Sequence, residues 1–167
     1  PDHPSGTDRL AEVAMQYPDV DVIINVQGDE PMIDPDIIDR LAKAFEGNDD
    51  LKMATMKVPM KESEYNDPAA VNALYFSRSL IPYPRNEIEG MRVYKHVGVY
   101  AYRRDFLLQY AALEPTMLEK VEGLEQLRAL ENGYKIKVLE SDFQGIGIDT
   151  PEDLEAINKL FAAKNNK

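Results

Sequence analysis

The chain has 167 residues and a formal net charge of −11, with 44% hydrophobic residues and no cysteine. That length is enough for one domain with a sizeable core, and the hydrophobic content is ordinary for a globular protein. The acidic balance argues against nucleic-acid binding through a basic surface and against docking on anionic lipid. The lack of cysteine excludes disulfides and thiolate metal sites.

No apolar run approaches the roughly 20 residues of a membrane span, and no signal peptide is visible, so the sequence predicts a cytoplasmic protein. The first residue is Pro1 rather than Met, from which we expect that an N-terminal part is missing. Without an internal repeat, a low-complexity tract or a long linker, residues 1–167 are expected to form a single domain.

The first third of the chain reads as helix, strand, helix. Ser5 or Thr7 can cap a helix whose apolar residues recur at helical spacing. Residues 22–26 are almost continuously apolar and rich in β-branched side chains, which predicts a strand buried on both faces of a parallel sheet. Asp34 and Pro35 then have the cap and first-position roles of a second helix.

Three further strands are predicted in the middle and last third. Residues 53–60 form the first, and residues 73–77 form a short one that delivers Arg78 to its end. Residues 94–102 form a long strand with His96, Gly98 and Tyr100 on one face.

The remaining predictions are mainly helical. A helix starts at Asp105, and a second one runs from the capping box of Thr116 and Glu119 to Gly133. A half-buried strand at 135–140 and a final helix after Thr150 complete the chain. This order of elements predicts an α/β fold with three layers, a mostly parallel sheet and helices on both of its faces.

Two acidic residues with glycine neighbours follow predicted strands. Asp29 comes after Gly28, and Asp149 comes shortly after Gly147. Open α/β sheets bind ligands beyond the carboxyl ends of their strands, where carboxylates can hold a divalent cation. Solvated acids in ordinary turns are the alternative, and the residues alone leave it open.

Several segments together resemble one enzyme family. They are 2–9 (Asp-His-Pro-Ser-Gly-Thr-Asp-Arg), 27–31 (Gln-Gly-Asp-Glu-Pro), 74–78 with 81–83, 95–100 (Lys-His-Val-Gly-Val-Tyr), 124–128 and 147–153. In this order they are similar to the 3-deoxy-manno-octulosonate (Kdo) cytidylyltransferases. The resemblance implies a nucleotide-diphospho-sugar transferase fold of Rossmann-like type. It also implies transfer of CMP from CTP to Kdo, with release of pyrophosphate, for lipopolysaccharide biosynthesis.

The resemblance also implies site residues. Asp29 and Asp149 match the family's two Mg²⁺ ligands. Positions that meet the sugar acid are matched by Arg78, His96, Tyr100, Glu125 and Gln126, with Arg78 suited to a carboxylate. Gln27, Ser5, Gly6 and Thr7 match the substrate and nucleotide side, although capping alone also accounts for Ser5 and Thr7.

The sequence departs from the family in two places. The family begins with a strand and an Arg-, Gly- and Lys-rich loop that grips the triphosphate, and we expect about 60 or more residues to be missing before Pro1. The family also places a strand and a turn between the segments that meet at Val71 and Asn72. We therefore predict that these two residues are not bonded to each other in the protein.

Other readings stay open beside this one. The enzyme could take another acid sugar, such as a sialic acid, or the chain could be a non-catalytic binding or dimerisation module. Family likeness implies a homodimer, and the aromatic and proline residues of 81–97 predict that this stretch contributes to the two-fold interface.

Overall fold

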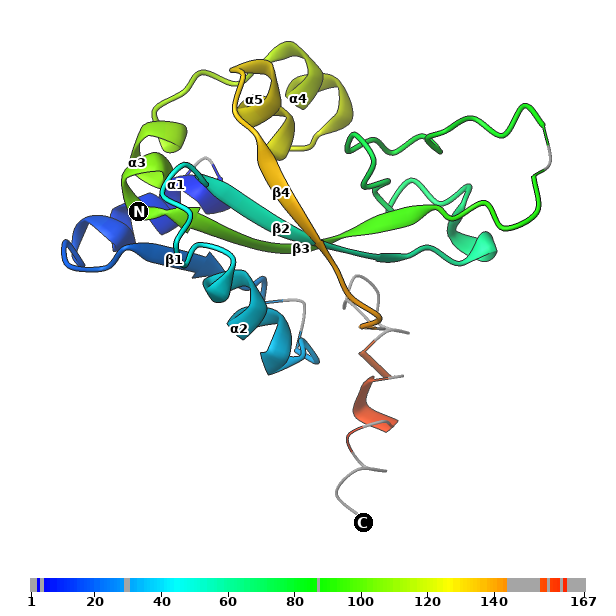
Figure 1. The fold of residues 1–167 in the computed structure, drawn as a ribbon, viewed down its shortest axis with the longest axis horizontal. Coiled ribbons are helices and arrows are strands. Elements are labelled where there is room, and N and C mark those ends of the chain that lie inside the picture. Colours follow the sequence, from blue (N-terminus) through cyan, green and yellow to red (C-terminus); the bar gives the residue numbers. More distant parts are fainter. Residues whose placement is uncertain are drawn as a thin grey trace.

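The computed structural model describes residues 3, 5–28, 31–86, 88–143, 154, 155, 157–159 and 161. Within them, four strands form one sheet in the order β1-β3-β2-β4 (Figure 1). The strands are β1 (Val22–Asn25), β2 (Met53–Pro59), β3 (Tyr94–Arg103) and β4 (Ile136–Glu140).

The sheet is mixed. β3 runs antiparallel to both of its neighbours, β1 and β2, whereas β2 and β4 pair in parallel. Strands β1, β2 and β4 therefore point the same way, as expected, and the reversed β3 lies between two of them. The α/β class is confirmed, but the prediction of a mostly parallel sheet missed the direction of β3, because residue alternation carries no information on strand direction.

Helices cover both faces of the sheet, which confirms the three layers (Figure 1). Helix α2 packs its apolar stripe on one face, and α1, α3 and α5 contribute to the core on the other. The helices are α1 (Gly6–Met15), α2 (Pro35–Lys43), α3 (Arg104–Ala111), α4 (Met117–Glu122) and α5 (Gln126–Glu131), with a 3₁₀ turn η1 (Glu62–Glu64). No helix in the described part of the chain is long and apolar enough to cross a membrane.

The N-terminal caps follow the sequence. The Ser5 hydroxyl accepts a hydrogen bond from the Asp8 amide at 3.3 Å, and the Asp34 carboxylate accepts one from the Asp36 amide at 3.0 Å. Pro35 occupies the start of α2, where its missing N–H costs nothing. The starts of both helices are therefore fixed by their own side chains.

Strand β1 is less buried than its sequence predicts. It pairs only with β3 among the described residues, and all four of its residues are half-buried. The expectation of a strand buried on both faces within a parallel sheet is wrong for this structure, because a strand at the sheet edge has a neighbour on one side only.

The helix predicted from Thr116 to Gly133 is two helices. Gly123 has φ 63° and ψ 40°, a left-handed conformation that ends α4, and α5 starts three residues later. The break leaves Val121 78% exposed, whereas Leu124 and Leu127 enter the core as expected. A helical apolar pattern continues through the break, so periodicity alone could not find it.

Residues 73–77 form a tight turn instead of the predicted strand. An antiparallel bridge joins Asn72 to Ser77, and the Asn72 side-chain oxygen accepts the Leu74 amide at 3.0 Å. Phe76 has a φ of 80°, which no strand residue adopts. The side-chain hydrogen bond competes with strand pairing and closes the turn.

The junction between Val71 and Asn72 is held on both sides by backbone hydrogen bonds. The Val71 carbonyl accepts the His96 amide at 2.7 Å, and the Asn72 amide donates to the Ser77 carbonyl at 2.7 Å. The discontinuity between these two residues stays a prediction. Most of the final predicted helix lies outside the described residues, although Ile157 is buried there.

Candidate functional site

A cavity of about 240 Å³ lies where the start of α1, the end of β1, one face of β3 and the junction between α4 and α5 meet. We call it the main cavity. Seven of the residues predicted from sequence line it, namely Gly6, Thr7, Gln27, His96, Tyr100, Glu125 and Gln126. Segments separated by more than a hundred positions thus contribute to one site.

The β1 side of the cavity is lined by Asn25 and Gln27. Both belong to the alternating set that faces one side of an extended chain. Sequence reasoning selected Gln27 but missed Asn25, although a polar residue at the end of an apolar strand, two positions from Gln27, was the available signal.

The β3 side of the cavity depends on a β-bulge. Thr55 pairs with Tyr100 and Met56 pairs with Val97, so the pairing with β2 skips Gly98 and its neighbour Val99. Bulges bend a strand locally and re-aim side chains beside binding sites. His96, Gly98 and Tyr100 all line the cavity, which confirms that they share a face.

His96 is held in place by a hydroxyl and by two aromatic rings. Its Nε2 lies 2.8 Å from the Thr55 Oγ1. The Phe76 ring meets it edge-on at 5.3 Å and the Tyr100 ring is tilted at 5.1 Å, both between ring centres. Burial lowers the pKa of His96 to about 3, so the ring is neutral near pH 7.

Thr55 is a second site residue that sequence reasoning missed. It is fully buried, and it is the one hydroxyl residue within the apolar run from Met53 to Met56. A polar residue at a core position of a strand needs hydrogen-bond partners, and that requirement was the available signal.

Tyr100 and Gln126 form a hydrogen-bonded pair on the cavity wall. The Tyr100 hydroxyl donates to the Gln126 Oε1 at 3.0 Å. Burial raises the pKa of Tyr100, and the nearby Tyr110 and Glu125 raise it further, so the phenol stays protonated. The Gln126 Nε2 is buried and has no hydrogen-bond partner among the described residues, which leaves an N–H donor for a ligand.

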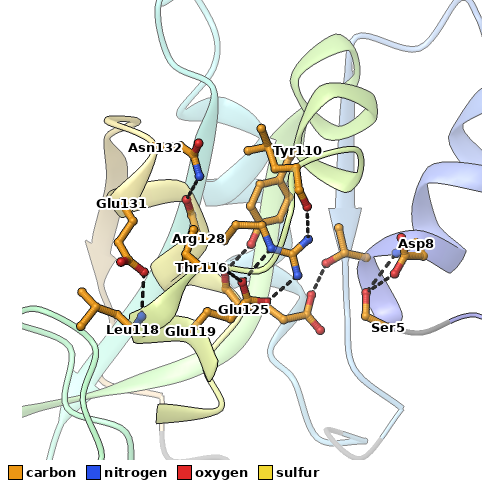
Figure 2. A network of polar contacts seen from close by, with 12 residues as sticks. Ser5, Asp8, Tyr110, Thr116, Leu118, Glu119, Glu125, Arg128, Glu131 and Asn132 are labelled. Carbon is orange, nitrogen blue, oxygen red and sulfur yellow. Dashed lines mark hydrogen bonds and ion pairs between the residues drawn. The ribbon is translucent and has the colours of Figure 1, made fainter. Parts of the chain in front are cut away.

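Glu125 joins the junction between α4 and α5 to helix α1. The Thr7 hydroxyl donates to the Glu125 Oε2 at 2.5 Å, across 118 positions of sequence. The Tyr110 hydroxyl donates to the Glu125 main-chain carbonyl at 2.5 Å (Figure 2). Side chain and backbone of this residue are thus both fixed, so its carboxylate has a defined position on the cavity wall.

A buried ion pair anchors α4 to α5 beside the cavity (Figure 2). The Arg128 guanidinium binds both carboxylate oxygens of Glu119, and the Nε–Oε2 distance is 2.8 Å. The same carboxylate accepts the Thr116 amide at 3.1 Å, which completes the predicted capping box. Burial raises the pKa of Glu119, but the hydrogen bonds from Arg128 and Thr116 outweigh it and leave the pKa below its ordinary value.

Arg78 is not part of the cavity lining. Its Nε, Nη1 and Nη2 donate to the carbonyls of Glu122, Pro68 and Gly123 at 2.7, 2.8 and 3.4 Å. The guanidinium therefore lies behind Gly123, which itself lines the cavity. The hydrogen bond from the Arg78 amide, then that from Ser77, lowers the pKa of Glu122 despite its burial. Recognition of a carboxylate by Arg78 stays a prediction.

The remaining predicted residues lie apart from the main cavity or outside the described chain. Ser5 lines a neighbouring cavity of about 560 Å³, which shares Gly123 and Glu125 with the main one. Asp29 and Asp149, the predicted metal ligands, lie outside the described residues. Within the described residues, no group of three or more acidic or histidine side chains could hold a metal ion.

The main cavity offers hydrogen bonds more than charge. A neutral imidazole, three amide side chains, three phenols, a threonine hydroxyl and one carboxylate line it, together with three glycines. Such a set suits a small molecule with several hydroxyl groups, because each hydroxyl both donates and accepts a hydrogen bond.

Comparisons with known proteins show the family to which the chain belongs. Residues 1–136 match the family described as cytidylyltransferase. A 3-deoxy-manno-octulosonate cytidylyltransferase of Fusobacterium nucleatum is 46% identical, over 99% of this chain and 71% of the relative. One from Pelobacter propionicus is 45% identical, over 99% and 72%. The solved structure of CMP:2-keto-3-deoxy-manno-octonic acid synthetase complexed with CTP has a TM-score of 0.90 at 44% identity, covering 98% of this chain and 70% of that one.

The Fusobacterium match also bears on the junction at Val71 and Asn72. It extends over 174 aligned positions, more than the 167 residues of this chain, so that relative has residues in the matched region that this chain lacks. The match does not place them, and their expected position at this junction stays a prediction.

Proposed function

This chain belongs to the 3-deoxy-manno-octulosonate cytidylyltransferase family, and we propose that its main cavity is the sugar-acid site of that reaction. The enzyme transfers CMP from CTP to Kdo. The anomeric hydroxyl of Kdo attacks the α-phosphorus of CTP, and a new phosphorus–oxygen bond forms. The bond from that phosphorus to the β-phosphate bridging oxygen breaks, pyrophosphate leaves, and the hydroxyl proton is released.

One observation supports this use of the cavity more than any other. Seven residues that the family resemblance selects converge on one cavity, although they come from four separate segments of the chain. His96, Tyr100 and Gln126 supply neutral hydrogen-bonding groups, and Glu125 supplies a carboxylate that can accept from hydroxyls. In this proposal they position the sugar, which is most of what a phosphoryl-transfer enzyme must do.

The nucleotide is proposed to lie beside the sugar, near the start of α1. Gly6 and Thr7 face the main cavity there, and the first-turn amides of a helix favour negative charge. Gln27, two residues after the end of β1, lines the cavity, and in this proposal it contacts one of the two substrates.

We propose Mg²⁺ as the metal, held by Asp29 and Asp149. When bound, such an ion neutralises phosphate charge and lowers the pKa of a coordinated hydroxyl. Among the described residues, no group of three or more acidic or histidine side chains could hold a metal ion. The role that we assign to the described residues is to bind and orient the sugar.

Pyrophosphate release from CTP, with magnesium titrated, tests the function in the natural full-length protein. We expect release with Kdo and little with a sialic acid. Asp149→Asn should lower turnover about a hundredfold or more, because it removes one charge at the proposed metal site. Asp142→Asn, an exposed neighbour, is the matched control. Near-normal turnover of Asp149→Asn, or equal use of a sialic acid, would overturn the respective proposal.

We also propose a homodimer through the stretch 81–97, in a cytoplasmic enzyme. Tyr83 is 82% exposed and Ile88 is 69% exposed on this stretch, more apolar surface than a solvated loop needs. Sedimentation should give a dimer at micromolar concentration, and Tyr83→Ser should shift it toward monomer. A monomeric wild-type protein would contradict the proposal.

A further inference from the structure

The deepest contact of the cavity wall is the one between Thr55 and His96. Thr55 lies on β2 opposite Tyr100, at the β-bulge, and is fully buried. Its Oγ1 lies 2.7 Å from the Val99 carbonyl oxygen, 3.4 Å from the Val97 carbonyl oxygen and 2.8 Å from the His96 Nε2. Three partners therefore surround a hydroxyl that has one proton to donate.

The location of that proton follows from the two short distances. An oxygen–oxygen contact of 2.7 Å to a carbonyl is a hydrogen bond only if the Thr55 hydroxyl donates, because the carbonyl of Val99 has no proton. With its proton used, the Thr55 oxygen can meet the His96 Nε2 only as an acceptor. Nε2 must then carry a proton, since two lone pairs facing each other at 2.8 Å would repel.

The second ring nitrogen of His96, Nδ1, consequently carries no proton. A neutral imidazole has one N–H, and burial keeps His96 neutral by lowering its pKa to about 3. No side chain or backbone group in the described part of the chain hydrogen-bonds to Nδ1. That nitrogen is an acceptor on a residue that lines the main cavity.

Neighbouring groups agree with a fixed, neutral ring. The rings of Phe76 and Tyr100 contact His96 at 5.3 and 5.1 Å between centres and hold its plane. The ionisable groups around it are the Tyr100 phenol, Lys57 opposite it on β2 and Glu125 across the cavity. Lys57 is paired with Glu140 at 3.4 Å, and Glu125 is bonded to Thr7, so neither makes a hydrogen bond to the imidazole.

We propose that Thr55 is a positioning residue that holds His96 as its Nε2–H tautomer, so that Nδ1 accepts a hydrogen bond from a hydroxyl of the ligand. A carboxylate or phosphate oxygen has no proton to give and is disfavoured at this point of the cavity. The Val99 carbonyl orients the Thr55 hydroxyl, and Thr55 in turn fixes the proton on the His96 Nε2. Through these two hydrogen bonds, a backbone carbonyl makes the cavity favour a ligand hydroxyl at Nδ1. Identifying the ligand as the sugar acid rests on the proposed function, but the tautomer does not.

Nitrogen NMR of the free wild-type protein measures the tautomer directly. The chain has two histidines, so His3→Gln assigns the signals of both rings. We expect a protonated Nε2 and an unprotonated Nδ1 for His96 at pH 7. A protonated Nδ1, or a doubly protonated ring, overturns the proposal whether or not any variant folds.

Two substitutions then test what Thr55 contributes in the natural full-length enzyme. Thr55→Val keeps the shape and removes the hydroxyl, and Thr55→Ser keeps the hydroxyl. We expect Thr55→Val to mix the two tautomers and raise the KM for the sugar about tenfold, with kcat changed less than about threefold. Thr55→Ser should restore the Nε2–H signal and bring the KM within about twofold of wild type.

The outcomes separate the two proposals. If wild-type protein releases no pyrophosphate from CTP and Kdo, the proposed function fails, while the His96 tautomer is still measured. If Thr55→Val keeps the Nε2–H tautomer and an unchanged sugar KM, the positioning role of Thr55 is wrong, while the proposed function stands.

Discussion

The two faces of the sheet are covered by different kinds of side chain, mainly aliphatic on one face and aromatic and polar on the other. On the α2 face, aliphatic and methionine side chains from α2, β2 and β3 form the core around Leu41 and Met56. On the opposite face, the rings of His96, Tyr100, Tyr102 and Tyr110 contact one another in series. The hydroxyls of Tyr100 and Tyr110 donate hydrogen bonds to the Gln126 side chain and to the Glu125 carbonyl. The buried Gln126, Glu119 and Arg128 also belong to elements of this second face.

This difference teaches how one sheet can be both rigid and chemically selective. Hydrocarbon packing is non-directional and tolerates small shifts, so the α2 face can hold β2 and β3 together without specifying hydrogen bonds. A polar face holds its buried groups through directional hydrogen bonds, which favour one arrangement of each bonded side chain. Four predictions test this difference in role between the two faces, from the largest expected effect to the smallest.

Leu41→Ala is expected to destabilise the fold most and to leave binding alone. Leu41 is fully buried on the α2 face, so truncation should lower the free energy of unfolding by about 4 kcal/mol through lost contacts and a cavity. Urea unfolding measures the loss, and the sugar KM should stay within about twofold. Leu74→Ala, at a residue that is 72% exposed, is the control and should change little. A large change in the KM of Leu41→Ala would contradict the idea that the α2 face contributes to stability and not to sugar binding.

Arg128→Met should cost about 3 kcal/mol, because it leaves the buried Glu119 carboxylate without its partner. Since the pair positions α5, we expect the KM for the sugar to rise as well, unlike in Leu41→Ala. Thermal unfolding and initial rates measure the two effects. The double variant Arg128→Met with Glu119→Leu should recover much of the stability. A double variant no more stable than the single one would show that the charge is not the cause.

Tyr100→Phe removes one hydroxyl and leaves the Gln126 Oε1 without its donor, at a cost of about 1.5 kcal/mol. The freed amide can turn, so the KM for the sugar is expected to rise about fivefold. Chemical unfolding and a sugar titration at saturating CTP give both numbers. Tyr83→Phe, a change at an exposed tyrosine, is the matched control. An unchanged KM would remove Tyr100 from the substrate site.

The smallest effect concerns pH. The pKa of His96 is lowered to about 3, so between pH 6.5 and 3 the unfolded chain binds a proton that the folded chain does not. Stability should therefore fall as the pH drops, by about 1 kcal/mol between pH 6.5 and 5.5. His96→Gln should flatten this slope, and His3→Gln should not. An equal slope in both variants would place His96 in a far more solvated site.

Local signals in the sequence predicted much of this architecture. Ser5 and Asp34 cap their helices with their own side chains, and the Glu119 carboxylate accepts the Thr116 amide at the start of α4. The alternation along β3 placed His96 and Tyr100 on the cavity face. Each of these features depends on residues within a few positions of one another, which is why sequence alone could reveal them.

The errors have a different origin. The left-handed Gly123 and the local hydrogen bonds of Asn72 interrupt segments whose apolar pattern continues, so periodicity missed the break after α4 and the turn at 73–77. The half-burial of β1 follows from its pairing with β3 alone among the described residues, which local pattern does not show. Three main-chain carbonyls hold the Arg78 guanidinium, an arrangement that the sequence does not show, and its role as a partner of a carboxylate stays a prediction. A lone hydroxyl in an apolar strand marked Thr55 as a residue that needs a partner, but only the pairing of β2 with β3 identifies that partner as His96.

The hydrogen bond between Thr7 and Glu125 has a consequence for synthesis. Thr7 leaves the ribosome 118 residues before its partner, a delay of roughly ten seconds at ordinary translation rates. During that interval α1 can form and β1, β2 and β3 can pair, but the wall from Gly123 to Gln126 does not yet exist. The nascent chain must keep this tyrosine-lined face open to water, or covered by a chaperone, until its last third emerges.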